Sequence, residues 1–150
     1  MNQTTKGKTK MQEYHVTVYD NRTDWCQNGK HHRIDGPAIE WSDGTKHWYQ
    51  NGKLHRIGGP AVENKNGDRF WYENGEFHRT DGPAIEYVSG EKLWYQNDQR
   101  HRLDGPACEY ADGRVEYWEN GVEIPDPNVT REMTVAEIIK ELGYNVKIVK

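Results

Sequence analysis

The 150-residue chain has few of the residues from which most hydrophobic cores are built. Leu, Ile, Val and Phe together account for 24 residues, a share typical of disordered chains. Six Trp and nine Tyr oppose that interpretation, because each aromatic side chain that becomes buried removes about 150–250 Å² from water. The net charge of −4 is also too small to keep a chain expanded. We therefore expect a folded protein whose core is rich in aromatic rings.

Further absences exclude several classes of protein. The chain has only two cysteines, Cys26 and Cys108, too few for a disulfide scaffold. Reduced thiols, together with the lack of a signal-like segment near Met1, predict a cytoplasmic protein. No apolar run approaches the roughly 20 residues that a membrane-spanning helix needs, so we expect no membrane contact. The slight excess of acidic residues disfavours nucleic-acid binding.

A 23-residue repeat organises most of the chain. The unit reads W-Y-x-N-G-x-x-H-R-x-D-G-P-A-x-E and recurs without insertions. Units 1 to 4 begin at Trp25, Trp48, Trp71 and Trp94, and a degenerate half-unit begins at about residue 117. This pattern predicts three regions: a disordered basic tail over 1–12, a repeat array over 13–124 and a helix-strand cap over 125–150. The cap is indicated by a capping box from Thr134 to Glu137, followed by an apolar stripe.

Each unit carries the turn signals of β-hairpins. Asn51-Gly52 is typical of a type I′ turn, in which both central residues need positive φ. The S-D-G segment over 42–44 indicates a second turn, and the segment 45–50 has the length of a strand. Two strands per unit advance a sheet by about 10 Å. We therefore expect a mainly β fold, an elongated antiparallel sheet of tandem 23-residue hairpin repeats that ends in a short helix-strand cap.

Alternation along these strands predicts which residues share a face of the sheet. Trp48 points to one face and Tyr49 to the other, and the same holds in the other units. Lys46, Arg69 and Lys92 each lie two residues before a Trp on the same strand. These three cations are therefore expected to stack on the Trp rings.

The repeat resembles the MORN repeat family, whose unit of about the same length has the core aromatic-x-N-G-K-x-H-G. The segment Y-Q-N-G-K-L-H over 49–55 matches this core, and the resemblance covers roughly residues 24–124. After the histidine, MORN units have Gly, whereas this chain has Arg and then x-D-G-P-A. That variant is similar to uncharacterised repeat proteins of large bacteriophages and giant viruses. The resemblance implies a sheet of successive hairpins that serves as a scaffold or contact surface, and it brings no catalytic residues with it.

Two columns of the repeat supply candidate binding residues, and two interpretations of each stay open. The His-Arg pairs either form a cationic stripe for acidic groups or pair internally, each Arg with the Asp two residues later or with the Glu column. Gly58 replaces this Asp after Arg56. The Trp column either contacts a ligand or partner or packs along the sheet. The candidate binding residues are Arg33, Trp41, Trp48, His55, Arg56, Trp71, His78, Arg79, Trp94 and Arg102.

These columns favour binding over catalysis. An active site needs an asymmetric constellation of residues, and each unit has only one in-register His without zinc-type spacing. We therefore expect no enzyme activity, no metal and no cofactor. The leading prediction is a protein-interaction module that binds a protein partner or forms a homodimer through a sheet face or the C-terminal helix. If the viral resemblance holds, the partner is a host protein, such as a defence protein that is inhibited in the host cytoplasm.

The alternative prediction is a small-ligand binder that uses the Trp and His-Arg columns for a glycan or a nucleotide. The sequence leaves open the partner or ligand, the oligomeric state and which units are functional. Positions that depart from the repeat have two interpretations. Either function overrides the repeat at these positions, or their residues have drifted. These departures are His31, Trp41, His47, Gly58 and Asp98.

Overall fold

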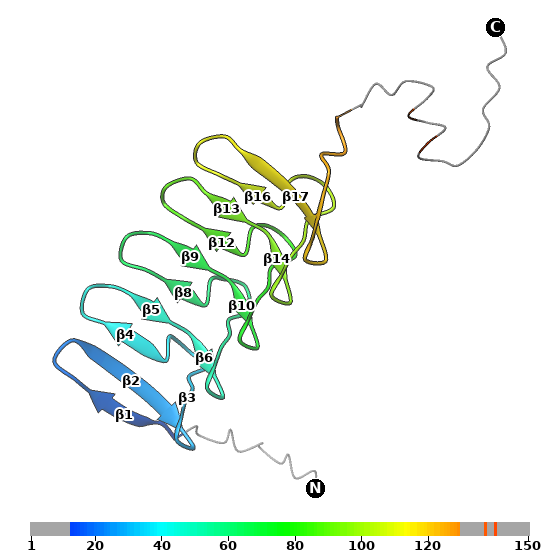
Figure 1. Ribbon diagram of the computed structural model, residues 1–150. Coiled ribbons are helices and arrows are strands. Elements are labelled where there is room, and N and C mark those ends of the chain that lie inside the picture. Colours follow the sequence, from blue (N-terminus) through cyan, green and yellow to red (C-terminus); the bar gives the residue numbers. More distant parts are fainter. Residues whose placement is uncertain (1–12, 130–136, 138–139, 141–150) are drawn as a thin grey trace, which may run out of the picture.

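The computed structural model describes residues 13–129, 137 and 140 (Figure 1). Across these residues the chain is mainly β and forms a long antiparallel sheet of successive hairpins, as predicted. The predicted tail over 1–12 lies outside the described residues. So does the predicted cap over 125–150 beyond residue 129, except for two helical residues, Glu137 and Lys140.

The hairpins lie side by side in chain order from one end of the molecule to the other (Figure 1). The main sheet has twelve strands in the order β1-β2-β4-β5-β8-β9-β12-β13-β16-β17-β18, with β3 beside β2. These strands are β1 (His15–Val18), β2 (Arg22–Gln27), β3 (Lys30–His31), β4 (Ile39–Trp41), β5 (Lys46–His47), β8 (Val62–Glu63), β9 (Arg69–Phe70), β12 (Ile85–Glu86), β13 (Lys92–Leu93), β16 (Cys108–Glu109), β17 (Val115–Glu119) and β18 (Val122–Ile124). Three small hairpins lie beside it, formed by β6 (Tyr49–Gln50) with β7 (Lys53–Leu54), β10 (Tyr72–Glu73) with β11 (Glu76–Phe77), and β14 (Tyr95–Gln96) with β15 (Gln99–Arg100).

In units 2 to 4 the long strand is interrupted at the tryptophan, whereas β2 of unit 1 runs through Trp25. In unit 2, β5 ends at His47 and β6 begins at Tyr49, with Trp48 between them. The Trp48 N–H donates to the Ala61 carbonyl at 2.8 Å, and the Trp48 carbonyl accepts from the His55 N–H at 3.0 Å. Units 3 and 4 repeat both bonds. Because these backbone groups stay paired, the chain passes from the sheet into a small hairpin without leaving them unsatisfied.

The Asn-Gly turns have the geometry that the sequence predicts. Asn51 and Gly52 have φ of 53° and 82°, the pair of positive values that a type I′ turn requires. In unit 4 an aspartate replaces the glycine, and Asn97 and Asp98 have φ of 50° and 60°. The Asp98 carboxylate accepts a 2.7 Å hydrogen bond from the Phe77 N–H of the preceding hairpin. This bond offsets part of the strain of a positive φ in a residue with a side chain.

Neighbouring small hairpins are joined to each other through their backbones. The Gly75 N–H donates to the Leu54 carbonyl at 2.8 Å, and the Arg56 N–H donates to the Tyr72 carbonyl at 3.3 Å. Equivalent bonds join the other units. The row of hairpins and the main sheet therefore advance together, and each unit is held by its immediate neighbours, as in other repeat arrays.

The core is thin and follows the repeat. Its buried hydrophobic residues are Ala38, Ile39, Ala61, Val62, Ala84, Ile85, Leu93, Ala107 and Cys108. Half-buried rings pack around Ile85, Leu93 and Cys108, namely those of Phe70, Phe77, Tyr87, Tyr95, Tyr110 and Trp118. The expected aromatic core is therefore present only as a partly buried shell, because the buried hydrophobic positions among the described residues are aliphatic or cysteine. No helix in the described part of the chain has the length and apolar character needed to cross a bilayer.

Candidate functional site

An arginine lies over a tryptophan ring in every full unit. The guanidinium carbon lies 4.2 Å from the ring centroid in unit 1, 3.9 Å in unit 2, 4.0 Å in unit 3 and 4.1 Å in unit 4. The pairs are Arg33–Trp25, Arg56–Trp48, Arg79–Trp71 and Arg102–Trp94. At this distance the cation is attracted by the electron-rich ring face. We call the surface that carries these four pairs the Arg-Trp face.

The prediction of which cations stack on the Trp rings was wrong. We expected Lys46, Arg69 and Lys92, but among the described residues the stacked cation is the arginine of the His-Arg pair. The physical reason lies in the strand register. Lys46 does share the sheet face of Trp48, but its partners on the adjacent strands are Glu40 and Glu63.

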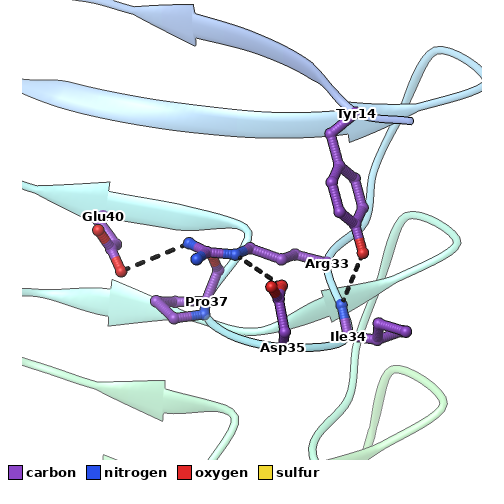
Figure 2. A network of polar contacts seen from close by, with 6 residues as sticks. All are labelled: Tyr14, Arg33, Ile34, Asp35, Pro37 and Glu40. Atoms are coloured by element: carbon purple, nitrogen blue, oxygen red, sulfur yellow. Dashed lines mark hydrogen bonds and ion pairs between the residues drawn. The ribbon is translucent and has the colours of Figure 1, made fainter. Parts of the chain in front are cut away.

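The same arginines also make directional bonds within their own unit. Figure 2 shows the network of Arg33, whose Nε donates to Asp35 at 3.0 Å and whose Nη1 donates to the Pro37 carbonyl at 3.2 Å. Glu40 lies 3.7 Å from the same Nη1. Units 3 and 4 repeat these contacts, with 2.9 Å between Nη1 and the glutamate. The internal pairing that the sequence suggested is thus present, and it holds the guanidinium in place above the ring.

Unit 2 departs from this pattern at Arg56. Its Nη1 donates to the Pro60 carbonyl at 3.1 Å and to Glu63 at 2.7 Å. Gly58 stands where the other units have aspartate, and no carboxylate of the described residues contacts the Arg56 Nε. The Arg56 side chain is 32% exposed, compared with 20–21% for the other three arginines of the face. Arg56 is therefore the arginine of this face whose Nε–H has no acceptor among the described residues.

The histidine column secures the turn of the next hairpin. His55 Nδ1 accepts from the Asn74 N–H at 3.1 Å, and His32 Nδ1 accepts from the Asn51 N–H at 3.0 Å. The later units repeat this bond. An accepting Nδ1 places the proton of the neutral ring on Nε2. No group of three His, Cys, Asp or Glu residues suited to a metal occurs within residues 13–129, 137 and 140.

Three half-open pockets follow one another along the Arg-Trp face. Each is lined by the Trp and His-Arg pair of one unit and by the loop that begins at the arginine of the unit before it. Their cavity volumes are about 570, 540 and 560 Å³ around Trp48, Trp71 and Trp94. Nine of the ten predicted binding residues are therefore brought together in these pockets. They are Arg33, Trp48, His55, Arg56, Trp71, His78, Arg79, Trp94 and Arg102.

Exposed aliphatic side chains line the same pockets. Ile34, Ile57 and Leu103 are 60%, 85% and 77% exposed, and Thr80 takes the equivalent place in unit 3. The N–H of Ile34 donates to the Tyr14 hydroxyl at 3.3 Å, which ties the first loop to the N-terminal end of the sheet (Figure 2). Sequence reasoning missed this row, because the position varies between units. In the sequence, the row corresponds to the third residue of each H-R-x-D segment, which is aliphatic in three of the four units.

Trp41, the tenth predicted residue, lies on the opposite side of the sheet, which we call the aromatic face. Its ring meets the His47 ring edge-on at 4.4 Å between centroids. Burial lowers the pKa of His47. Nearby, the buried Asp24 contacts the Arg22 Nε at 3.0 Å and the His31 Nε2 at 3.2 Å. Trp41 therefore belongs to a packed cluster at the N-terminal end of the array and not to the pockets.

A second polar cluster lies at the other end of the aromatic face. Glu116 accepts from Trp118 Nε1 at 3.0 Å, Tyr110 Oη at 3.0 Å and Arg100 Nη1 at 3.2 Å. These donors, the indole first, lower the pKa of Glu116. Burial raises the pKa of the adjacent Cys108 thiol to about 11. A thiol in this state is protonated at neutral pH and is a poor nucleophile.

Comparisons with models of protein families, with curated proteins and with solved structures found no significant match for this chain. The resemblance to MORN repeats therefore stays a prediction from the sequence. The hairpin architecture stands independently of it, on the strand order and register.

Proposed function

We propose that the protein is a non-enzymatic interaction module that presents its Arg-Trp face to a protein partner. The observation that carries this proposal is the row of exposed aliphatic side chains beside the pockets, Ile34, Ile57 and Leu103. Burying an aliphatic side chain of this size contributes about 1.5–3 kcal/mol. Tryptophan and arginine next to such side chains are typical of the residues that dominate protein interfaces.

The rigidity of the face further supports this proposal. Each arginine is held by a ring, a proline carbonyl and one or two carboxylates of its own unit. Side chains that are already ordered lose little entropy when a partner binds. The units repeat at about 10 Å, which is close to the advance of three residues in an extended chain. An extended segment of a partner is therefore the form of ligand that fits the row.

A small-ligand function has support of its own in the three pockets, whose volumes lie in the range of small-molecule sites. Against it, each Trp ring of the face already carries a guanidinium on one side, and this leaves less ring surface for stacking a sugar or a base. Binding to a host defence protein rests on the viral resemblance alone and stays a prediction. Homodimerisation stays a prediction as well.

The test compares two variants. One lacks the three aliphatic side chains of the row, and the control lacks three similarly exposed valines elsewhere. The triple variant Ile34→Ser, Ile57→Ser, Leu103→Ser is compared with Val18→Ser, Val88→Ser, Val129→Ser, whose side chains are 75%, 70% and 69% exposed. Immobilised proteins are incubated with a lysate of the native host cell, and the captured proteins are identified by mass spectrometry. We expect one set of proteins on the wild type and on the valine variant, and its loss from the row variant.

The same experiment can contradict the proposal. A wild-type protein that captures nothing and is a strict monomer by light scattering does not behave as an interaction module. Equal capture by all three proteins shows that the partner binds outside the row. For the small-ligand alternative, Trp48→Ala and Trp71→Ala are tested against a panel of glycans and nucleotides, and binding that these changes leave intact argues against that alternative.

A further inference from the structure

We propose that Arg56 and Gly58 form a carboxylate-binding site, in which an acidic side chain of the protein partner occupies the place that aspartate holds in the other units. This inference rests on the proposed function and names the partner chemistry of one pocket of the Arg-Trp face. The other units of the same chain serve as its structural template.

The template shows what this place binds. In units 1, 3 and 4 the arginine Nε lies 3.0, 2.8 and 2.9 Å from an aspartate Oδ1. The guanidinium stands over its tryptophan and donates to its proline carbonyl in unit 2 as in the others. The Arg56 Nε–H is therefore held in the orientation in which its counterparts bind a carboxylate. A planar guanidinium held in this way suits a carboxylate oxygen.

The loops of units 1 and 2 differ in sequence at one residue. Residues 32–38 read H-R-I-D-G-P-A and residues 55–61 read H-R-I-G-G-P-A. Gly58 has φ of 77°, a positive value that none of the aspartates at this position in the other units shares, and a Cβ built there would meet no atom within 4 Å. The space beside Gly58 is thus open, and it belongs to the 540 Å³ pocket that Arg56, Ile57 and Trp71 help to line.

The ion pairs of the other units show how many carboxylates one arginine of this face can bind. In units 1, 3 and 4 one arginine faces two carboxylates, the aspartate and the glutamate. Arg56 faces Glu63 alone, so a second carboxylate restores the arrangement that the protein uses three times elsewhere. Ile57, 85% exposed, is the most exposed aliphatic side chain of the row. The partner segment is therefore expected to carry an acidic residue next to an apolar one.

The direct test uses the capped dipeptide acetyl-Leu-Asp-amide, with acetyl-Leu-Asn-amide as the neutral control and inorganic phosphate as the competing anion. The readout is the Nε–H resonance of each arginine in ¹⁵N-edited NMR spectra of the full chain. We expect the aspartyl dipeptide to shift the Arg56 signal toward the position of the three aspartate-paired arginines. An equal shift with the asparagine dipeptide, a larger one with phosphate, or none at all overturns the proposal.

Two reciprocal variants sharpen this test. Gly58→Asp gives unit 2 the loop sequence of unit 1. Because an aspartate adopts the positive φ of Gly58 only under strain, we expect the loop to take the backbone of unit 1, in which its own carboxylate abolishes the response of Arg56. Asp35→Gly gives unit 1 the loop sequence of unit 2, and it is expected to make Arg33 respond to the dipeptide. The Arg56 Nε–H signal of Gly58→Asp shows whether the new carboxylate is paired, because it then moves to the position of the three aspartate-paired arginines. A response to the dipeptide that persists in that paired state overturns the proposal, even if Asp35→Gly fails to fold.

Partner capture links the site to the proposed function. Loss of one charge-assisted hydrogen bond corresponds to roughly tenfold weaker binding, so we expect Gly58→Asp to bind the captured partner about tenfold more weakly than the wild type. Undiminished capture by Gly58→Asp overturns the assignment to an acidic partner residue. The dipeptide titration needs no protein partner, so a failure of the proposed function and a failure of this site give different results.

Discussion

The two faces of the sheet obey different rules of variation. On the Arg-Trp face every full unit has the same tryptophan and arginine, whereas one column of the aromatic face runs His47, Phe70, Leu93 and Glu116. The regular face depends on directional contacts inside one unit, as in the bonds of Arg79 to Asp81, Pro83 and Glu86. A change in any of those residues leaves its partners unsatisfied.

The aromatic face is held mainly by packing between units. The Phe70 ring meets Tyr87 at 5.6 Å and Phe77 at 6.5 Å, and Phe77 meets Tyr95 at 5.4 Å. Packing of this kind tolerates hydrophobic exchange as long as the volume is conserved. Polar residues also enter this face, and the carboxylate of one of them, Glu116, accepts hydrogen bonds from three nearby donors. The comparison indicates that directional bonds keep the tryptophan and arginine positions regular, while close burial keeps the alanine column Ala38, Ala61, Ala84 and Ala107 regular.

The sharpest challenge to this comparison removes one ring from each face. Trp71→Ala deletes the support of Arg79 and a large half-buried side chain, and it is expected to lower the free energy of unfolding by about 3 kcal/mol. Phe70→Leu keeps most of the volume on the other face and is expected to lower it by about 1 kcal/mol. Urea unfolding followed by circular dichroism measures both. Equal losses would mean that the two faces do not differ in tolerance.

The next prediction compares two arginines of the same face. Arg79→Lys loses the fork that reaches Asp81, Pro83 and Glu86, with an expected cost of about 1.5 kcal/mol. Arg56→Lys has no aspartate to lose and is expected to cost about half as much. The same unfolding assay applies. A larger loss for Arg56→Lys would contradict the view that the aspartate completes the network.

A smaller effect is expected from the histidine column. His55→Ala removes the acceptor of the Asn74 N–H, and it is expected to lower the free energy of unfolding by about 1 kcal/mol. His47→Phe removes an imidazole from the aromatic face, where unit 3 already has Phe70, and serves as the matched control. Thermal unfolding of the two variants should rank His55→Ala as the less stable.

The smallest expected effect is a dependence of the free energy of unfolding on pH, which arises from His47 on the aromatic face. Burial lowers the pKa of His47, so its protonated form is favoured in the unfolded chain. Its contribution to stability is full above the ordinary histidine pKa of about 6.5 and is lost as the pH falls below that value. Unfolding curves from pH 7.5 to 5 should therefore decline less steeply for His47→Phe than for the wild type. Parallel curves would contradict this assignment.

Local rules were enough for much of the fold and part of the site. The Asn-Gly turns were predictable because positive φ at two successive positions demands such residues, and Asn51 and Gly52 have that geometry. The pairing of Arg33 with Asp35 was foreseen as one of two interpretations, since the residues are two positions apart. The cation over Trp48 was not predictable, because Arg56 reaches the ring only after the chain has turned through a hairpin.

The sequence by itself determined the repeat, the turns and the strand alternation, because each depends on residues close together in the chain. Only the tertiary structure decided which side chains meet across a hairpin. It placed Arg56 over Trp48, Trp41 on the far face and Ile57 beside a pocket. The reason is that strand alternation assigns side chains to a face, whereas the return path of the chain after each break decides what covers them.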